Sequence, residues 1–370
     1  MKRAFFVVFG IILLALGSYA VWFFAVAPKT ERAAVVENPP DTPPISVSPI
    51  VPPENQQPLP PLQNNGSATR AVSGARVVGF WIAKNSDIFV VTESGAILKN
   101  GESFSSGAPS GISSISGSPD GSRALIASGY PFAPSFTVFD IAAKKLIKLP
   151  YGIKAAAWGP SSSDELMILG TETGAALSRY SIGSGTFTRI ATVPATDPTL
   201  SWITPTEVAI HERFSSLVPA TAYTYTITSR VATITALDES GLSLLWSGDG
   251  SRALKLSGSA LTAIDQKGGA IAAFPFLAWP PDCAWDGAVL YCPSRAASAD
   301  RYYMDDYLKG KRPGRTRLFR IDFSAPEIPL ITEIKTPALP ESLDARMVKV
   351  LDKKLYFVDA PTGILYEVSL

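Results

Sequence analysis

Trp246-Ser-Gly-Asp-Gly-Ser-Arg-Ala-Leu254 is the stretch of sequence from which the fold follows, because its last six residues occur twice. Asp120-Gly-Ser-Arg-Ala-Leu125 recurs 129 residues later as Asp249-Gly-Ser-Arg-Ala-Leu254. In Ser118-Pro-Asp-Gly121, proline presets φ for an early turn position, aspartate caps the turn, and glycine takes positive φ at little cost. Both copies therefore predict a tight turn that leads into a β-strand.

The tryptophans give the period of the repeat. Trp158, Trp202 and Trp246 are 44 residues apart, and Trp285 follows 39 residues later. Each ends a short apolar run and precedes a turn, and the offset of 129 residues is three times 43. A period of about 40–45 residues is that of a four-stranded propeller blade. The spacing therefore predicts a β-propeller.

From Arg76 onward, short runs of Val, Ile, Thr, Tyr and Phe alternate with Gly, Pro, Ser and Asp, which predicts an all-β domain with many hairpins. Seven units fit the register, with six or eight as alternatives. Their anchor residues are Trp81, Gly117, Trp158, Trp202, Trp246, Trp285 and about Val350. The five tryptophans are predicted to pack between blades. A solenoid is the structural alternative, but it needs polar caps that are not evident in this sequence.

The last unit is one strand short of a blade. Its predicted strands are Val348–Val350, Leu355–Asp359 and Ile364–Ser369. Residues 68–78 have strand-like composition and no blade of their own. Because unpaired sheet edges invite aggregation, we predict that part of this segment pairs with the C-terminal unit and closes the ring.

The Trp246–Leu254 segment resembles the WD-repeat-like propeller motif of the periplasmic TolB family, and Gly117–Leu125 matches its Ser-Pro-Asp-Gly core without the tryptophan. The resemblance covers roughly residues 76–370. It implies a propeller that is commonly exported and commonly binds proteins. Because the match is confined to turn residues, it carries over no binding site.

The N-terminus reads as a membrane anchor. Lys2 and Arg3 precede an uncharged apolar run, residues 4–27, which is long enough to span a bilayer. The positive flank predicts a cytoplasmic N-terminus and an extracytoplasmic C-terminal domain. A cleaved signal peptide is the alternative, although Pro28 directly after Ala25-Val-Ala27 argues against cleavage there.

A proline-rich segment follows the anchor. Residues 28–62 contain 11 prolines, which predicts an extended and disordered stalk. The expected organisation is therefore a cytoplasmic stub and transmembrane helix in residues 1–27, a stalk in residues 28–68 and a propeller in residues 69–370.

Composition argues against several functions. The net charge of +1 gives no field that would attract nucleic acid. His211 is the one histidine and Cys283 and Cys292 are the two cysteines, too few for the usual zinc sites. No cofactor, metal site or catalytic residue is predicted. Asp286-Gly287 is a hairpin signal that places the two cysteines on adjacent strands. A disulfide is expected there, with two buried thiols as the alternative.

The unusual segment is an insertion between residues 293 and 317, rich in Tyr, Lys and Arg. Tyrosine and arginine are enriched at binding hot spots, whereas the plainer interpretation is a solvated loop. The candidate partner-binding residues are Arg301, Tyr302, Tyr303, Tyr307, Lys309, Lys311, Arg312 and Arg315.

The sequence thus favours a non-enzymatic scaffold of the cell envelope that binds a protein partner whose identity the sequence does not give. The alternative is a lyase or hydrolase that acts on an envelope glycan, with its site in the propeller channel.

Overall fold

The computed structural model describes most of the C-terminal part of the chain. The described residues are 69–170, 176–193, 195–312, 314–325, 329–335 and 342–370. The predicted anchor, residues 4–27, and the stalk, residues 28–68, lie outside them. Within the described residues, no helix has the length and apolar character needed to cross a membrane.

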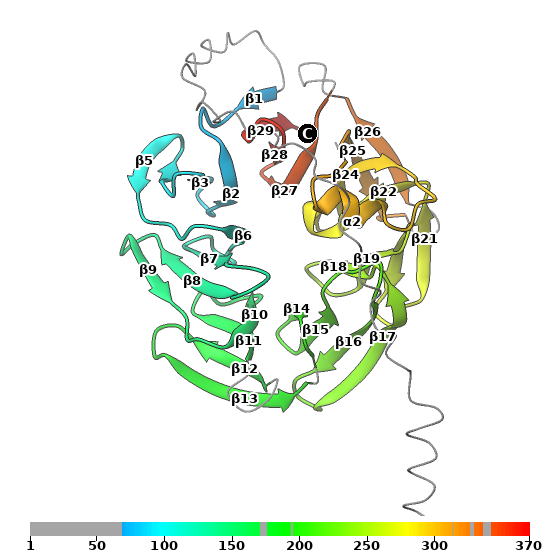
Figure 1. Ribbon diagram of the computed structural model, residues 1–370, viewed down its shortest axis with the longest axis horizontal. Helices are drawn as coiled ribbons and strands as arrows, with labels where there is room; N and C mark the ends of the chain where they lie inside the picture. The colour runs from blue at the N-terminus through cyan, green and yellow to red at the C-terminus, as the bar shows by residue number, and fades with distance from the viewer. Residues whose placement is uncertain (1–68, 171–175, 194, 313, 326–328, 336–341) are drawn as a thin grey trace, which may run out of the picture. The chain divides into compact units, whose positions relative to one another are not determined.

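Seven antiparallel sheets follow one another around a ring (Figure 1). Blade 1 is β2 (Val77–Ile82), β3 (Ile88–Thr92), β4 (Ile97–Lys99) and β5 (Glu102–Ser105). Blade 2 is β6 (Ile112–Gly117), β7 (Arg123–Ser128), β8 (Ser135–Asp140) and β9 (Lys145–Lys148). Blade 3 is β10 (Ile153–Trp158), β11 (Glu165–Gly170), β12 (Ala176–Ser181) and β13 (Thr186–Thr192). Blade 4 is β14 (Pro198–Thr204), β15 (Glu207–Glu212), β16 (Pro219–Thr226) and β17 (Val231–Ser240).

The remaining blades are less uniform. Blade 5 is β18 (Ser243–Trp246), β19 (Arg252–Ser257), β20 (Ala260–Asp265) and β21 (Ala270–Phe274). In blade 6, the short helix η1 (Pro280–Asp282) separates β22 (Phe276–Ala278) from β23 (Ala284–Asp286), and both strands pair with β24 (Val289–Ala296). Blade 6 continues with α2 (Tyr303–Leu308), β25 (Arg317–Asp322) and β26 (Leu330–Ile334). Blade 7 is β27 (Ala345–Leu351), β28 (Lys354–Asp359) and β29 (Ile364–Ser369), with β1 (Thr69–Ala71) on its outer edge. The first strands β2, β6, β10, β14 and β27 lie toward the centre of the ring (Figure 1).

The ring closes as predicted. Strand β1 pairs antiparallel with β29, and the amide of Val72 donates to the carbonyl oxygen of Leu365 at 2.8 Å. Val77 and Phe80 of blade 1 share a core cluster with Tyr356 and other residues of blade 7. The first strand of the domain therefore completes the last sheet, which confirms the closure and the count of seven blades.

The repeated turns have the predicted conformation. Gly121 and Gly250 have φ of 67° and 70°. The hydroxyl of Ser118 donates to Asp120 at 2.8 Å, and that of Ser247 donates to Asp249 at 2.6 Å. At Gly121 a side chain would also meet the backbone of blade 1, where a Cβ would lie 2.3 Å from the Cα of Ala83.

The tryptophans lie at the boundaries between blades. The indole nitrogen of Trp158 donates to the carbonyl oxygen of Ser116 in blade 2, and that of Trp285 donates to Leu245 in blade 5. Trp81 lies against Gly117 of the next blade, where a Cβ would be 3.2 Å from the Cβ of Trp81. Trp81, Trp158, Trp202 and Trp246 are buried, and Trp285 is half-buried.

Because neighbouring strands are antiparallel, the connections alternate between two faces of the ring. We call the face with the turns at residues 118–121 and 247–250 the turn face. We call the opposite face, with the connections β7–β8, β9–β10, β13–β14, β15–β16 and β24–β25, the loop face. The insertion of blade 6 therefore belongs to the loop face. It contains the helix α2, which the sequence did not lead us to expect.

Candidate functional site

The insertion, residues 297–316, is packed down onto the ring. Met304 and Tyr307 of α2 are 1% and 0% exposed, within the core cluster of blades 5 and 6. The carboxylate of Asp305 accepts a hydrogen bond of 3.1 Å from the amide of Ser216, in the β15–β16 connection of blade 4. The insertion is therefore held by blades that are distant in sequence.

The structure separates the predicted partner-binding residues into three groups. Five are exposed: Arg301, Tyr302, Lys309, Lys311 and Arg315. Tyr303 and Arg312 are half-buried, and Arg312 is paired with Asp300 at 2.6 Å. Tyr307 is fully buried, so its side chain is not presented to a partner in this conformation. Among the described residues, Arg301, Lys309 and Arg315 carry no ion pair.

Tyr307 belongs to a buried charged cluster. Its hydroxyl donates to the Oδ1 atom of Asp344 at 2.8 Å, and the guanidinium of Arg295 donates to the same oxygen at 2.8 Å. The guanidinium carbons of Arg295 and Arg346 lie 3.7 and 4.5 Å from the centre of the Tyr307 ring. Burial raises the pKa of the Tyr307 phenol well above its ordinary value, so the hydroxyl remains a donor.

Asp282 of η1 lies beside this cluster, and its Oδ1 atom accepts a hydrogen bond of 3.0 Å from the amide of Met347 in β27. Burial raises the pKa of its carboxyl to about 6, although the amide of Met347 and the charges of Arg295 and Arg346 act in the opposite direction. Four polar atoms here are buried without a hydrogen-bond partner among the described residues: Asp282 Oδ2, Arg295 Nε, Arg295 Nη1 and Arg346 Nε. Unpaired buried polar atoms are costly, so this cluster has capacity for further polar contacts.

The loop face exposes large apolar side chains. Phe132 in the β7–β8 connection is 95% exposed and Tyr151 in the β9–β10 connection is 92% exposed. Leu217 and Val218 in the β15–β16 connection are 69% and 62% exposed. Isolated exposed apolar residues are common, but these lie on neighbouring connections of one face.

Specific contacts join these connections. The guanidinium carbon of Arg213 lies 3.5 Å from the centre of the Tyr130 ring, and the Tyr130 hydroxyl donates to Asp197 at 2.8 Å. Arg213 also pairs with Asp197 at 3.2 Å. The connections that carry Phe132 and Leu217 are thus linked to each other, and the bond from Ser216 to Asp305 extends the link to α2.

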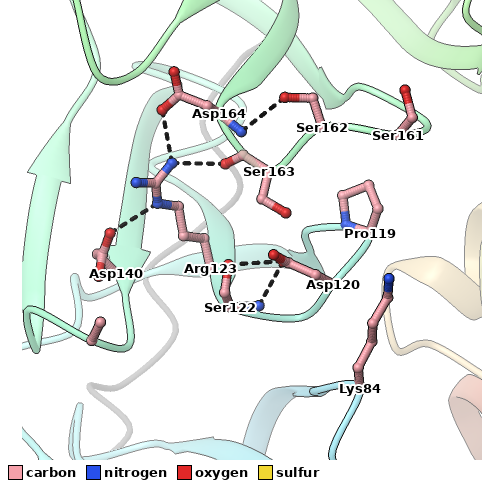
Figure 2. A pocket seen from close by; sticks show the side chains of 11 residues that line it. Lys84, Pro119, Asp120, Ser122, Arg123, Asp140, Ser161, Ser162, Ser163 and Asp164 are labelled. Carbon is pink, nitrogen blue, oxygen red and sulfur yellow. Dashed lines mark hydrogen bonds and ion pairs between the residues drawn. The ribbon is translucent and has the colours of Figure 1, made fainter.

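A polar pocket of about 620 Å³ lies on the turn face, between blades 2 and 3 (Figure 2). Arg123 donates to Asp140 at 2.8 Å and to Asp164 at 2.9 Å. Partial burial acts to raise the pKa of Asp120, but hydrogen bonds from Ser163, Ser122 and Ser118 outweigh it and hold that pKa below its ordinary value. The carboxylates of this pocket are therefore engaged with their own chain, and we interpret the pocket as a junction between blades.

The two cysteines and the histidine lie in environments typical of residues that support the fold. Cys283 and Cys292 form a disulfide with a Cα–Cα distance of 4.4 Å, beside the predicted hairpin. His211 is buried in β15, its Nδ1 lies 2.8 Å from the carbonyl oxygen of Glu212, and burial lowers the pKa of its imidazole. In the part of the chain that the structure describes, no group of three or more His, Cys, Asp or Glu residues is placed to hold a metal ion.

No protein-family model and no curated protein matches this chain. Solved β-propellers do resemble the structure. The Swd1 β-propeller domain of Myceliophteria thermophila aligns with a TM-score of 0.56 and 10% identity, over 81% of this chain and 98% of that one. The virginiamycin B lyase of Staphylococcus aureus aligns with a TM-score of 0.51 and 12% identity, over 84% and 98%.

The tricorn protease aligns with a TM-score of 0.53 and 10% identity over 84% of this chain, which spans only 34% of that protein. At these identities the likeness shows the fold alone. The chain is therefore a seven-bladed β-propeller, and its closer relationship to the TolB family is not shown. Enzymes and non-enzymes share this fold, so the function has to be argued from the side chains.

Proposed function

We propose that this protein is a membrane-anchored, extracytoplasmic scaffold of the cell envelope that binds a protein partner through the loop face of its propeller. The observation that carries the proposal is the linked set of loop-face connections with exposed apolar side chains. Phe132 is almost fully exposed, and Tyr130 of the same connection is tied through Asp197 and Arg213 to the connection that carries Leu217. Tyr151, on the β9–β10 connection of the same face, is also almost fully exposed.

Rigid presentation of apolar side chains suits protein binding. Aromatic residues supply large contact areas, and connections that are already ordered lose little entropy on association. The exposed cations Arg301, Lys309 and Arg315 lie on the insertion of the same face, without ion pairs among the described residues, so they remain available to an acidic partner. Functional residues are disproportionately found on loops that a rigid scaffold positions.

The binding face can be tested by site-specific photo-crosslinking in intact cells. A crosslinking amino acid at Phe132, Tyr151 or Leu217 should give the same discrete protein adduct. Lys267 in the β20–β21 turn is exposed on the turn face and is the matched control position, where no such adduct is expected. Equal labelling from both faces, or none from the loop face, would contradict the proposal.

The membrane placement has its own test. Protease added to intact spheroplasts should release a soluble fragment that begins within residues 28–75, because the cationic residues Lys2 and Arg3 precede the apolar run. Complete protection of the C-terminal domain would show that the orientation is reversed.

One observation favours the alternative, an enzyme that acts on an envelope glycan. Asp282 is a buried carboxyl with a raised pKa and one oxygen that has no hydrogen-bond partner among the described residues, and such perturbed groups are concentrated at active sites. Purified protein incubated with envelope glycans should release no fragments if the scaffold proposal holds. Fragment release that is lost in Asp282→Asn would establish the enzyme instead.

A further inference from the structure

A second pocket, of about 490 Å³, lies on blade 6 at the base of the insertion. Its lining includes Arg315, Arg317, Ser294, Phe276 and Phe319, and no Asp or Glu residue contributes to it. This composition is the opposite of that of the turn-face pocket, where Asp140 and Asp164 neutralise Arg123. Cationic and aromatic groups therefore meet here without an internal counter-charge in the lining.

The two arginines are held side by side. Between them, Thr316 is buried and fixed: its amide donates to the carbonyl oxygen of Leu343 at 2.8 Å, and its Oγ1 accepts from the amide of Ala345 at 2.9 Å. Thr316 thus binds blade 7. Because side chains alternate along an extended segment, Arg315 and Arg317 project to the same side as each other, and both line the pocket together with Thr316.

Neither guanidinium is strongly neutralised. Within the described residues, Arg315 has no ion pair and Arg317 pairs only with Glu333, at an N–O distance of 3.8 Å. The Arg317 side chain is 73% exposed. An exposed ion pair at this distance is weak, so a bound anion can compete with it. Two adjacent guanidiniums with planar donor sets suit carboxylate and phosphate oxygens.

Two aromatic rings give the lining a flat apolar part, beside Ser294, Arg295 and Thr316. The rings of Phe276 and Phe319 are stacked with centroids 5.0 Å apart and an interplanar angle of 9°. Phe274 extends the stack, with its ring centroid 5.5 Å from that of Phe276. Burying a ring against this surface contributes affinity that a bare inorganic ion does not gain.

We propose that this pocket binds an organic anion in which a carboxylate or phosphate is attached to a flat apolar ring. Arg315 and Arg317 bind the charged group, and the Phe276–Phe319 stack contacts the ring. The volume of about 490 Å³ is in the range of small-molecule sites. The proposal goes beyond the scaffold function, because it does not depend on the identity of the protein partner or on the exposed side chains of Phe132 and Tyr151.

Ligand-observed NMR titrations of the full chain in non-ionic detergent test the proposal with four probes: benzoate, phenyl phosphate, inorganic phosphate and benzyl alcohol. We expect benzoate or phenyl phosphate to bind about tenfold more tightly than both inorganic phosphate and benzyl alcohol, because only the first two combine charge with a ring. Whichever of the two binds more tightly identifies the head group.

The double variant Arg315→Gln/Arg317→Gln should lose this binding without a change in melting temperature, because both side chains are exposed. Lys267→Gln removes an exposed cation of the turn face that does not line the pocket, and this variant should bind the probes as the parent does. Binding of benzyl alcohol as tight as that of benzoate would show a merely apolar pocket. Inorganic phosphate as tight as phenyl phosphate would show a merely charged surface, and no binding below about 10 mM would also overturn the proposal.

Discussion

Replacing Tyr307 by phenylalanine tests the buried cluster that holds the insertion onto the ring. The substitution removes only the hydroxyl that donates to Asp344 at 2.8 Å and leaves the ring in place. The contacts of Arg295 and Arg346 with the ring, at 3.7 and 4.5 Å from its centre, are therefore retained. The change removes the hydroxyl's bond to the buried carboxylate of Asp344 and, with it, an acceptor of the Arg295 guanidinium.

The expected loss of stability follows from the contacts that Asp344 keeps in the variant. A hydrogen bond to a charged group contributes about 1.5–3 kcal/mol, and an orphaned buried acceptor costs a similar amount. Asp344 keeps the donor of Arg295 at 2.8 Å and the charge of Arg346 at 3.6 Å, so the loss should lie at the lower end, about 1.5–2 kcal/mol. For a domain of this size we expect the melting temperature to fall by about 2–4 °C.

Thermal unfolding followed by tryptophan fluorescence measures the effect. Tyr302→Phe is the matched control, because Tyr302 is 37% exposed on the same insertion and surface substitutions usually change stability by less than about 0.5 kcal/mol. If Tyr307→Phe were as stable as Tyr302→Phe, the bond to Asp344 would contribute nothing and the reasoning about the cluster would be refuted. Partner adducts from the loop face should also weaken in Tyr307→Phe if the position of α2 matters for binding.

Three further predictions concern other parts of the fold. Replacing Cys283 and Cys292 by serine should cost about 2–3 kcal/mol, because the disulfide closes a short loop; quantitative alkylation of both cysteines in the denatured, unreduced parent would show instead that no disulfide exists. Val72→Pro removes the amide that donates to Leu365 and should lower stability by at least about 1 kcal/mol in urea unfolding, whereas an unchanged midpoint would mean that the closing strand contributes nothing. Asp282 has a pKa of about 6 in the folded state, above its ordinary value of 3.8, so the folded state binds the extra proton. The free energy of unfolding should therefore fall by up to about 3 kcal/mol as pH rises from about 4 to 6, and Asp282→Asn should remove this loss. Parallel pH profiles for parent and variant would show that Asp282 does not cause the pH dependence.

The fold could be predicted because its determinants are local and repeated. A turn such as Ser118–Gly121 depends on four neighbouring residues, so its chemistry is visible in the sequence and its recurrence gives the blade period. Ring closure could be predicted because the C-terminal unit lacks one strand of a four-stranded blade. Residues 68–78 have strand-like composition and belong to no other predicted blade, so they could supply that strand. The structure satisfies both conditions, with Gly121 at φ 67° and Thr69–Ala71 paired to β29.

The candidate site was less accessible to such reasoning because it depends on contacts between distant residues. Helix α2 has six residues, too few to show a helical period, and Tyr307 looks like its exposed neighbour Tyr302 until the structure places it against Asp344. Similarly, no local pattern distinguishes Arg295, which is buried and paired, from Arg315, which is exposed and unpaired among the described residues. Charge and residue type located the insertion, but burial decides which of its side chains can bind.

These contacts also bear on how the loop face would work. Asp305 binds the amide of Ser216, and the connection that contains Ser216 carries Leu217 and follows Arg213, which stacks on Tyr130. A displacement of α2 would therefore be transmitted to the exposed apolar residues through direct contacts rather than through the sheets. If the scaffold proposal is correct, the buried face of the insertion is as important for binding as its exposed cations, because it sets the position of a surface to which three blades contribute.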